Sequence, residues 1–124
     1  MMALENQRAY TLADILRYVL SADEQYVMDD YDLYVAAGNE EVRADLRCTV
    51  SDEGVEGDED GYDVYPAFVA ERGLEYFCSG ELLEDVVINA KLHGERRGAA
   101  PTMAELVAGL DFYLERDAFR ELDA

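Results

Sequence analysis

The residues of this sequence that could do chemistry are mainly carboxylates, and they are concentrated in one stretch. The segment Ser51–Gly61, SDEGVEGDEDG, holds six acidic residues and no lysine or arginine. Within it, Glu56, Asp58 and Asp60 fall on positions 1, 3 and 5 of a calcium-binding EF-hand loop, with a glycine at position 6. Position 12 should be a bidentate glutamate, but here it is Ala67. The spacing therefore does not predict an EF-hand, and we expect no metal and no other cofactor.

The other reactive side chains do not form a recognisable catalytic set. His93 is the single histidine and falls at an expected helix end, where a cation suits the helix dipole. Cys48 and Cys78 lie within apolar, strand-like patterns, which are typical of buried thiols, although a disulfide between them stays open. No glycine-rich phosphate loop follows a predicted strand. We therefore expect that the protein is not an enzyme.

Composition limits the classes of protein to which the chain can belong. Its 124 residues are half apolar, which suffices for a single domain (residues 1–124) with a buried core. The 29 acidic and ten basic residues give a formal net charge of −19. This charge argues against direct binding to nucleic acid or to an anionic membrane, because such contacts need lysine and arginine. With no apolar run of membrane-spanning length and no secretion signal, we expect a cytoplasmic location.

Hydrophobic periodicity predicts an α+β fold with a small antiparallel sheet of about three strands and four helices packed mainly on one face. A capping box at Thr11 and a second at Thr102 each begin a helix, and Ser79 caps a third that Gly94 should end. In the first strand, period-2 alternation places Tyr34 on a polar face. The expected helices span residues 11–20, 66–73, 79–92 and 102–114, the strands span 31–36, 46–50 and 74–78, and residues 51–61 form an acidic flexible loop.

Most of the excess charge belongs to residues 21–65, which hold fifteen acidic and two basic residues, a net charge of −13. Several tyrosines are interleaved with these acids, and aromatic residues beside charge are typical of protein interfaces. We also expect the helical acids Glu81, Glu84 and Asp85 to extend this surface. The predicted partner-binding residues are Asp23, Glu24, Asp29, Asp30, Tyr31, Asp32, Tyr34, Glu40, Glu41, Asp58, Glu59, Asp60, Tyr62 and Asp63.

Three segments in the second half of the chain resemble a known family. They are YPAFVAERGLEYF, LEDVVINAKL and PTMAELVAGLDFYLERDAF, and together they cover about Tyr65–Phe119. They resemble a family of small acidic bacterial domains of unassigned function, which supplies no catalytic residues. The size and charge are similar in style to immunity proteins and phage-encoded inhibitors.

These observations favour a non-enzymatic acidic inhibitor that binds a basic protein surface and blocks nucleic-acid binding, as anti-CRISPR or anti-restriction DNA mimics do. The expected partner is a larger protein with such a surface, and the inhibitor could be a monomer or a homodimer. One alternative is an immunity protein that neutralises a cationic bacterial toxin. Another is an enzyme subunit or a stable domain whose acidity serves only solubility.

Overall fold

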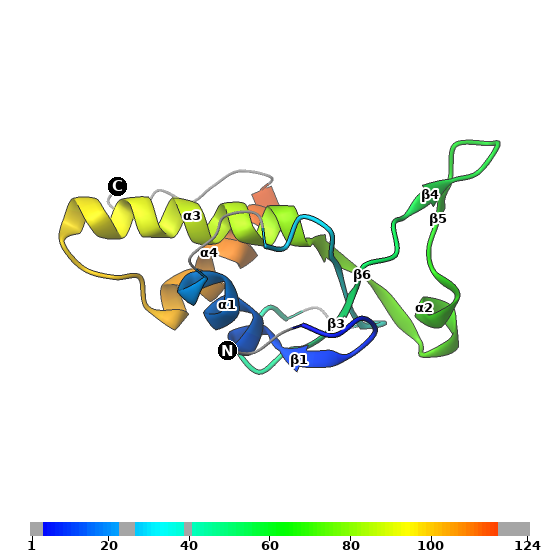
Figure 1. Cartoon of the computed structure of the whole chain (residues 1–124), viewed down its shortest axis with the longest axis horizontal. Helices are drawn as coiled ribbons and strands as arrows, with labels where there is room; N and C mark the ends of the chain where they lie inside the picture. The colour runs from blue at the N-terminus through cyan, green and yellow to red at the C-terminus, as the bar shows by residue number, and fades with distance from the viewer. Residues whose placement is uncertain (1–3, 23–26, 39–40, 117–124) are drawn as a thin grey trace.

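The computed structural model describes residues 4–22, 27–38 and 41–116, and it confirms the expected α+β fold with a small antiparallel sheet (Figure 1). The strands are β1 (Ala9–Thr11), β2 (Asp32–Ala36), β3 (Arg47–Ser51), β4 (Glu56–Gly57), β5 (Asp63–Val64) and β6 (Leu74–Ser79). The helices are α1 (Leu12–Ser21), α2 (Ala67–Glu71), α3 (Gly80–Arg97) and α4 (Met103–Arg116).

Local hydrogen bonds begin the helices as the sequence predicts. The Thr11 hydroxyl accepts from the N–H of Asp14 at 3.2 Å, and the Ser79 hydroxyl accepts from the N–H of Leu82 at 3.1 Å. At the start of α4, Thr102 and Glu105 each accept a hydrogen bond from the other's backbone N–H, both at 3.1 Å. These caps satisfy N–H groups that have no partner within a helix.

The main sheet has the strand order β1-β3-β2-β6, and every pairing is antiparallel. It has one strand more than expected, because β1 contains only three residues and shows no periodicity of its own. On one face, Leu33, Val50 and Cys78 join a core that α1, α3 and α4 supply with leucine, isoleucine and valine side chains. This burial is the principal stabilising contribution to the fold.

The opposite face of the sheet is covered as well. Tyr34 is fully buried there, with its ring edge-on to Phe68 at 5.6 Å and to Tyr65 at 6.2 Å. Phe68 and Val69 of α2 are also buried in this second, smaller core. The prediction that Tyr34 lies on a solvent face and contacts a partner is therefore wrong, because α2 and the segment before it pack over this strand.

A β-bulge in β6 decides which side chains reach the second face. Tyr34 pairs with Tyr76, but Leu33 pairs with Cys78, so β6 has one extra residue at this point. Without it, Tyr76 and Cys78 would share a face, since they are two residues apart. With it, Cys78 joins the main core while Tyr76 contacts Tyr34, at 5.7 Å between ring centroids.

Helix α3 continues past the glycine that was expected to end it. Gly94 lies inside the helix, where a Cβ would collide with the backbone oxygen of Ala99. The helix ends instead at Gly98, which has a φ of 72°, and the N–H of Ala99 donates to the carbonyl of Gly94 at 2.9 Å. This is a Schellman motif, so Gly94 provides space for the turn and Gly98 provides its left-handed backbone.

Replacement of Gly80 by alanine is expected to destabilise the protein by about 2 kcal/mol, because overpacking at a site without free space costs about this much. A Cβ on Gly80 would overlap the backbone oxygen of Met28 and lie 2.8 Å from that of Tyr31. Helix propensity alone predicts the opposite sign, so equilibrium urea unfolding of Gly80→Ala decides between the two effects.

The control is Gly109→Ala in α4, where the new Cβ would meet only a Val86 methyl group at 3.5 Å. This variant should be more stable than the wild type by about 0.5–1 kcal/mol. Equal stability of the two variants would contradict the assigned steric role of Gly80.

Candidate functional site

The acidic arm, residues 52–65, is the most charged feature of the described structure. It leaves the end of β3, forms the antiparallel hairpin β4–β5 and projects away from the body of the domain (Figure 1). Its seven carboxylates are all exposed, and it contains no lysine or arginine, so its formal charge is −7. The stretch 51–61, expected as a loop without strands, thus includes β4 and most of a hairpin turn.

Asp58 closes the tip of the acidic arm. Its Oδ1 accepts the backbone N–H groups of Asp60 at 2.9 Å and Tyr62 at 2.8 Å. The backbone N–H of Asp58 donates to the carbonyl of Tyr62 at 2.9 Å, and Gly61 has a φ of 85°. The carboxylate that would fill position 3 of an EF-hand therefore serves as an Asx-turn acceptor and is engaged by its own backbone.

The base of the acidic arm is hydrogen-bonded to the N-terminal segment. The N–H of Asp52 donates to Asn6 Oδ1 at 3.0 Å, and Gln7 Nε2 donates to Glu53 at 3.2 Å. The Arg72 guanidinium donates to the carbonyl of Gln7 at 2.7 Å. The N-terminal segment therefore holds the arm at Asp52 and Glu53, and Arg72 in turn holds Gln7 of that segment, so the carboxylates are presented from a fixed base.

Carboxylates project from both faces of the hairpin. Glu56 pairs with Val64 and Gly57 with Asp63. Since directly paired residues share a face and neighbouring residues alternate, Glu56 and Asp63 point to opposite sides. With Glu59 and Asp60 exposed at the tip, the arm is negatively charged all round.

Several predicted site residues lie beside the base of the arm. Asp32 pairs with Ser51, the last residue of β3, and the exposed Asp29 and Asp30 lie in the turn that precedes β2. Tyr31 is half-buried against the main core. Burial is the largest effect that raises the pKa of Asp32, and a hydrogen bond from Tyr76 partly opposes it.

Other predicted residues lie elsewhere. Glu41 belongs to the β2–β3 connection, at the end of these strands opposite to the arm, and it pairs with Arg43 at 2.9 Å. Glu84 is buried and accepts the N–H of Met28 at 2.9 Å, so the expectation that it extends the surface is wrong. The amphipathic pattern of the helix predicts that the Glu84 carboxylate faces solvent. Its partner, the N–H of Met28, is distant in the sequence, so only the folded structure shows the contact. Three further predicted residues lie outside the described part of the chain: Asp23, Glu24 and Glu40.

Exposed aromatic residues accompany the carboxylates of the arm. Tyr62 has 72% of its surface exposed, and Tyr65 and Tyr76 each have 40%. Tyr62 was predicted as a site residue, but Tyr65 and Tyr76 were not. Tyr65 could have been selected from its place in the acidic region, whereas Tyr76 reaches this surface only through the bulge in β6.

The cysteines do not provide a nucleophile. Cys48 and Cys78 are free, buried thiols on β3 and β6, two strands that β2 separates. Burial raises the pKa of Cys48 to about 12 and also raises the pKa of Cys78. Both thiols are therefore protonated at neutral pH, and the reactive species of cysteine is the thiolate.

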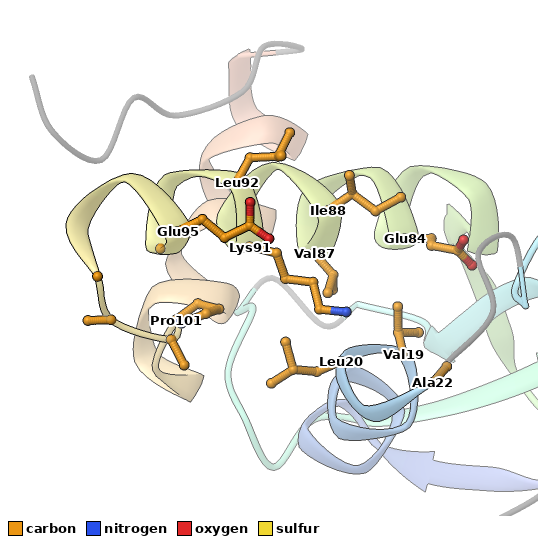
Figure 2. Close-up of a pocket in the computed structure, with 14 residues that line it drawn as sticks. Val19, Leu20, Ala22, Glu84, Val87, Ile88, Lys91, Leu92, Glu95 and Pro101 are labelled. Carbon is orange, nitrogen blue, oxygen red and sulfur yellow. The ribbon is translucent and has the colours of Figure 1, made fainter.

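A groove lies between α1, α3 and the connection from α3 to α4 (Figure 2). Its volume is about 660 Å³, and Val19, Leu20 and Val87 form part of its apolar lining. Lys91, the single lysine of the chain, extends its ammonium group between the two helices. The groove thus combines apolar surface with Lys91 and two carboxylates, Glu84 and Glu95, and lies away from the acidic arm.

The described residues hold neither a membrane-spanning helix nor a cluster of metal ligands. No helix among residues 4–22, 27–38 and 41–116 has the length and apolar character needed to cross a bilayer. Within the same ranges, no group of three or more His, Cys, Asp and Glu side chains is arranged to hold a metal ion.

Comparison with known proteins shows the family. Residues 12–122 match the family model described as "Domain of unknown function (DUF7716)". The chain belongs to this family. The expected membership of a family of unassigned function is therefore confirmed, and the match includes the acidic arm but begins after β1. No curated protein and no solved structure matches the chain.

In this DUF7716 domain, Asp58→Ala is expected to open the tip of the arm, because the N–H groups of Asp60 and Tyr62 lose their acceptor. Hydrogen exchange followed by NMR should show faster exchange of these two amides. Asp58→Asn keeps a carbonyl oxygen acceptor and removes the charge, so it should retain most of the protection. Equal loss of protection in both variants would show that charge, and not the Asx turn, maintains the tip.

Asp32→Asn is expected to raise the Tm at pH 7 by about 2 °C, a small effect because the group is partly solvated. Since burial raises the pKa of Asp32, the folded protein binds a proton there more tightly than the unfolded chain does. That stabilisation is present at low pH and is lost as the pH rises through the folded-state pKa, so the ionised group weakens the fold at pH 7.

The gain in Tm should therefore disappear near pH 3, where the wild-type carboxyl is protonated in both states. Asp30→Asn is the control, because it makes the same charge change at an exposed position two residues away. If Asp30→Asn raised the Tm as much, reduced net charge and not burial of Asp32 would explain the result.

Proposed function

We propose that this domain is a non-enzymatic inhibitor that binds a basic surface on a larger protein and blocks that surface to nucleic acid. The observation that carries the proposal is the acidic arm, with seven exposed carboxylates and no basic residue on a projecting hairpin. A concentrated field of one sign accelerates encounter with a surface of the opposite sign. Nucleic-acid-binding proteins carry such surfaces, because their contacts are mainly to phosphates.

The shape of the arm supports entry into a cleft. Carboxylates that point to both sides of a ribbon can contact two walls of a groove at once, whereas a single row would suit a flat basic surface. The arm is hydrogen-bonded at its tip and tied at its base, which lowers the entropy lost on docking. We therefore infer the DNA-mimic type of inhibition, as in anti-CRISPR or anti-restriction proteins, by an arm that occupies the nucleic-acid groove. A cytoplasmic location fits this proposal and the two free thiols.

The experiment compares three forms of the protein as bait at low salt in a lysate of the native host. The arm variant is Glu56→Gln, Glu59→Gln and Asp60→Asn, and it keeps Asp58 because Asp58 maintains the tip. The control variant is Glu95→Gln, Glu115→Gln and Asp111→Asn on α3 and α4. Each changes the net charge from −19 to −16 with the same residue types.

The proposal expects a protein that the wild type and the control variant retain and the arm variant loses. Salt should elute this partner, and duplex DNA or RNA should displace it. Retention that neither salt nor the arm variant changes would reject the proposal. A secreted cationic toxin as the retained protein would show instead that the surface belongs to an immunity protein.

A further inference from the structure

We propose that Tyr65, Tyr76 and Asp32 form an arginine-binding site at the base of the acidic arm. The inference rests on the proposed function, because it names the side chain by which a basic partner would be anchored. The arm would supply long-range attraction, and this site would supply the short-range contact.

The two tyrosine rings form an exposed aromatic surface. The ring centroids of Tyr65 and Tyr76 are 5.9 Å apart and their planes differ by 32°, with 40% of each residue exposed. Tyr34 supports both rings from the core side, edge-on at 6.2 and 5.7 Å. A guanidinium group can lie over such rings, held by the ring quadrupole and by planar stacking.

Asp32 places a carboxylate beside these rings. Its Oδ1 accepts a long hydrogen bond of 3.4 Å from the Tyr76 hydroxyl. Among the residues that the structure describes, no lysine or arginine forms an ion pair with Asp32. The partly desolvated carboxylate therefore retains acceptor capacity, and a guanidinium could supply two parallel N–H donors to it.

A second polar group, beneath the site, has no hydrogen-bond partner in the described part of the chain. The Tyr34 hydroxyl is buried and has no hydrogen bond within the described part of the chain. It lies near Asp32, Tyr65 and Glu53, whose charges add to the effect of burial and raise its pKa to about 12. A buried hydroxyl without a partner costs free energy, so its presence beside a carboxylate that has no ion pair favours a binding role for this cluster.

The bulge in β6 shows how the fold builds the site. It turns Tyr76 to the face of Tyr34 and Asp32, although strict alternation would turn it to the main core. Arginine fits the resulting geometry better than lysine, because its planar fork can stack and pair with a carboxylate at the same time.

The test uses two peptides of equal charge, acetylated and amidated hexa-arginine and hexa-lysine, and measures their affinity by calorimetry at low ionic strength. The wild type should bind hexa-arginine about five times more tightly than hexa-lysine, within the range of an exposed cation–π contact. Tyr65→Leu should reduce hexa-arginine affinity about fivefold and leave hexa-lysine affinity unchanged. Tyr113→Leu on α4 is the matched control, because it makes the same change outside the predicted partner-binding residues, and it should change neither affinity.

The outcomes separate this inference from the proposed function. If both peptides bind equally and the arm variant weakens both, the basic-surface proposal stands and the arginine site is rejected. If neither peptide binds the wild type, both are rejected. If Tyr65→Leu lowers both affinities alike, the rings do not discriminate arginine, and the site is rejected.

A second measurement does not depend on any variant. Titration of the wild type with hexa-arginine should shift the ring proton resonances of Tyr65 and Tyr76 more than those of Tyr62, and hexa-lysine should not. Shifts confined to residues of the arm tip would overturn the inference.

Discussion

The covering of β2 on both faces is the constraint on which the rest of this structure depends. β2 is an inner strand of the sheet, and its residues Leu33 and Tyr34 point to opposite sides with no exposed surface. One side faces the main core, and the other needs a second layer, which the short α2 and the residues around it supply. The acidic arm is the chain between β3 and this layer, so the packing of Phe68 and Tyr65 on Tyr34 also determines where the arm returns.

The same constraint separates charge from apolar surface. A domain with a net charge of −19 is destabilised by self-repulsion, and distance from the core and contact with water reduce that cost. The arm provides both, since all its carboxylates are exposed. Glu84 is the contrasting case, a buried carboxylate that accepts the N–H of Met28. Its position away from the arm indicates a structural role. In the described part of the chain, the carboxylates of the arm make contacts only in the turn at Asp58 and at the base, where Glu53 bonds to Gln7.

Local features could be predicted from the sequence, and non-local ones could not. The Thr11 and Thr102 caps follow from residues three positions apart, so their hydrogen bonds form wherever the helix forms. The burial of Tyr34 depends on α2, more than thirty residues later, and the exposure of Tyr76 depends on a one-residue shift in pairing. The sequence therefore predicts the acidic part of the candidate site, because charge follows directly from composition. It does not predict the faces of the sheet on which Tyr34 and Tyr76 lie, because these depend on packing and strand pairing.

The residues at the base of the arm indicate why it is more than a solvating segment. A phenylalanine in place of Tyr34 could fill the same core without an unpaired hydroxyl, and an asparagine in place of Asp32 could accept from Tyr76 without a charge. Both polar groups carry a cost that the fold does not require. The two costs occur side by side, next to two exposed rings and at the base of the most acidic segment, where a cationic side chain would pair with the Asp32 carboxylate. Solubility alone explains exposed carboxylates at the tip, but it does not explain, at the base, a buried hydroxyl without a hydrogen bond and a partly buried carboxylate without an ion pair.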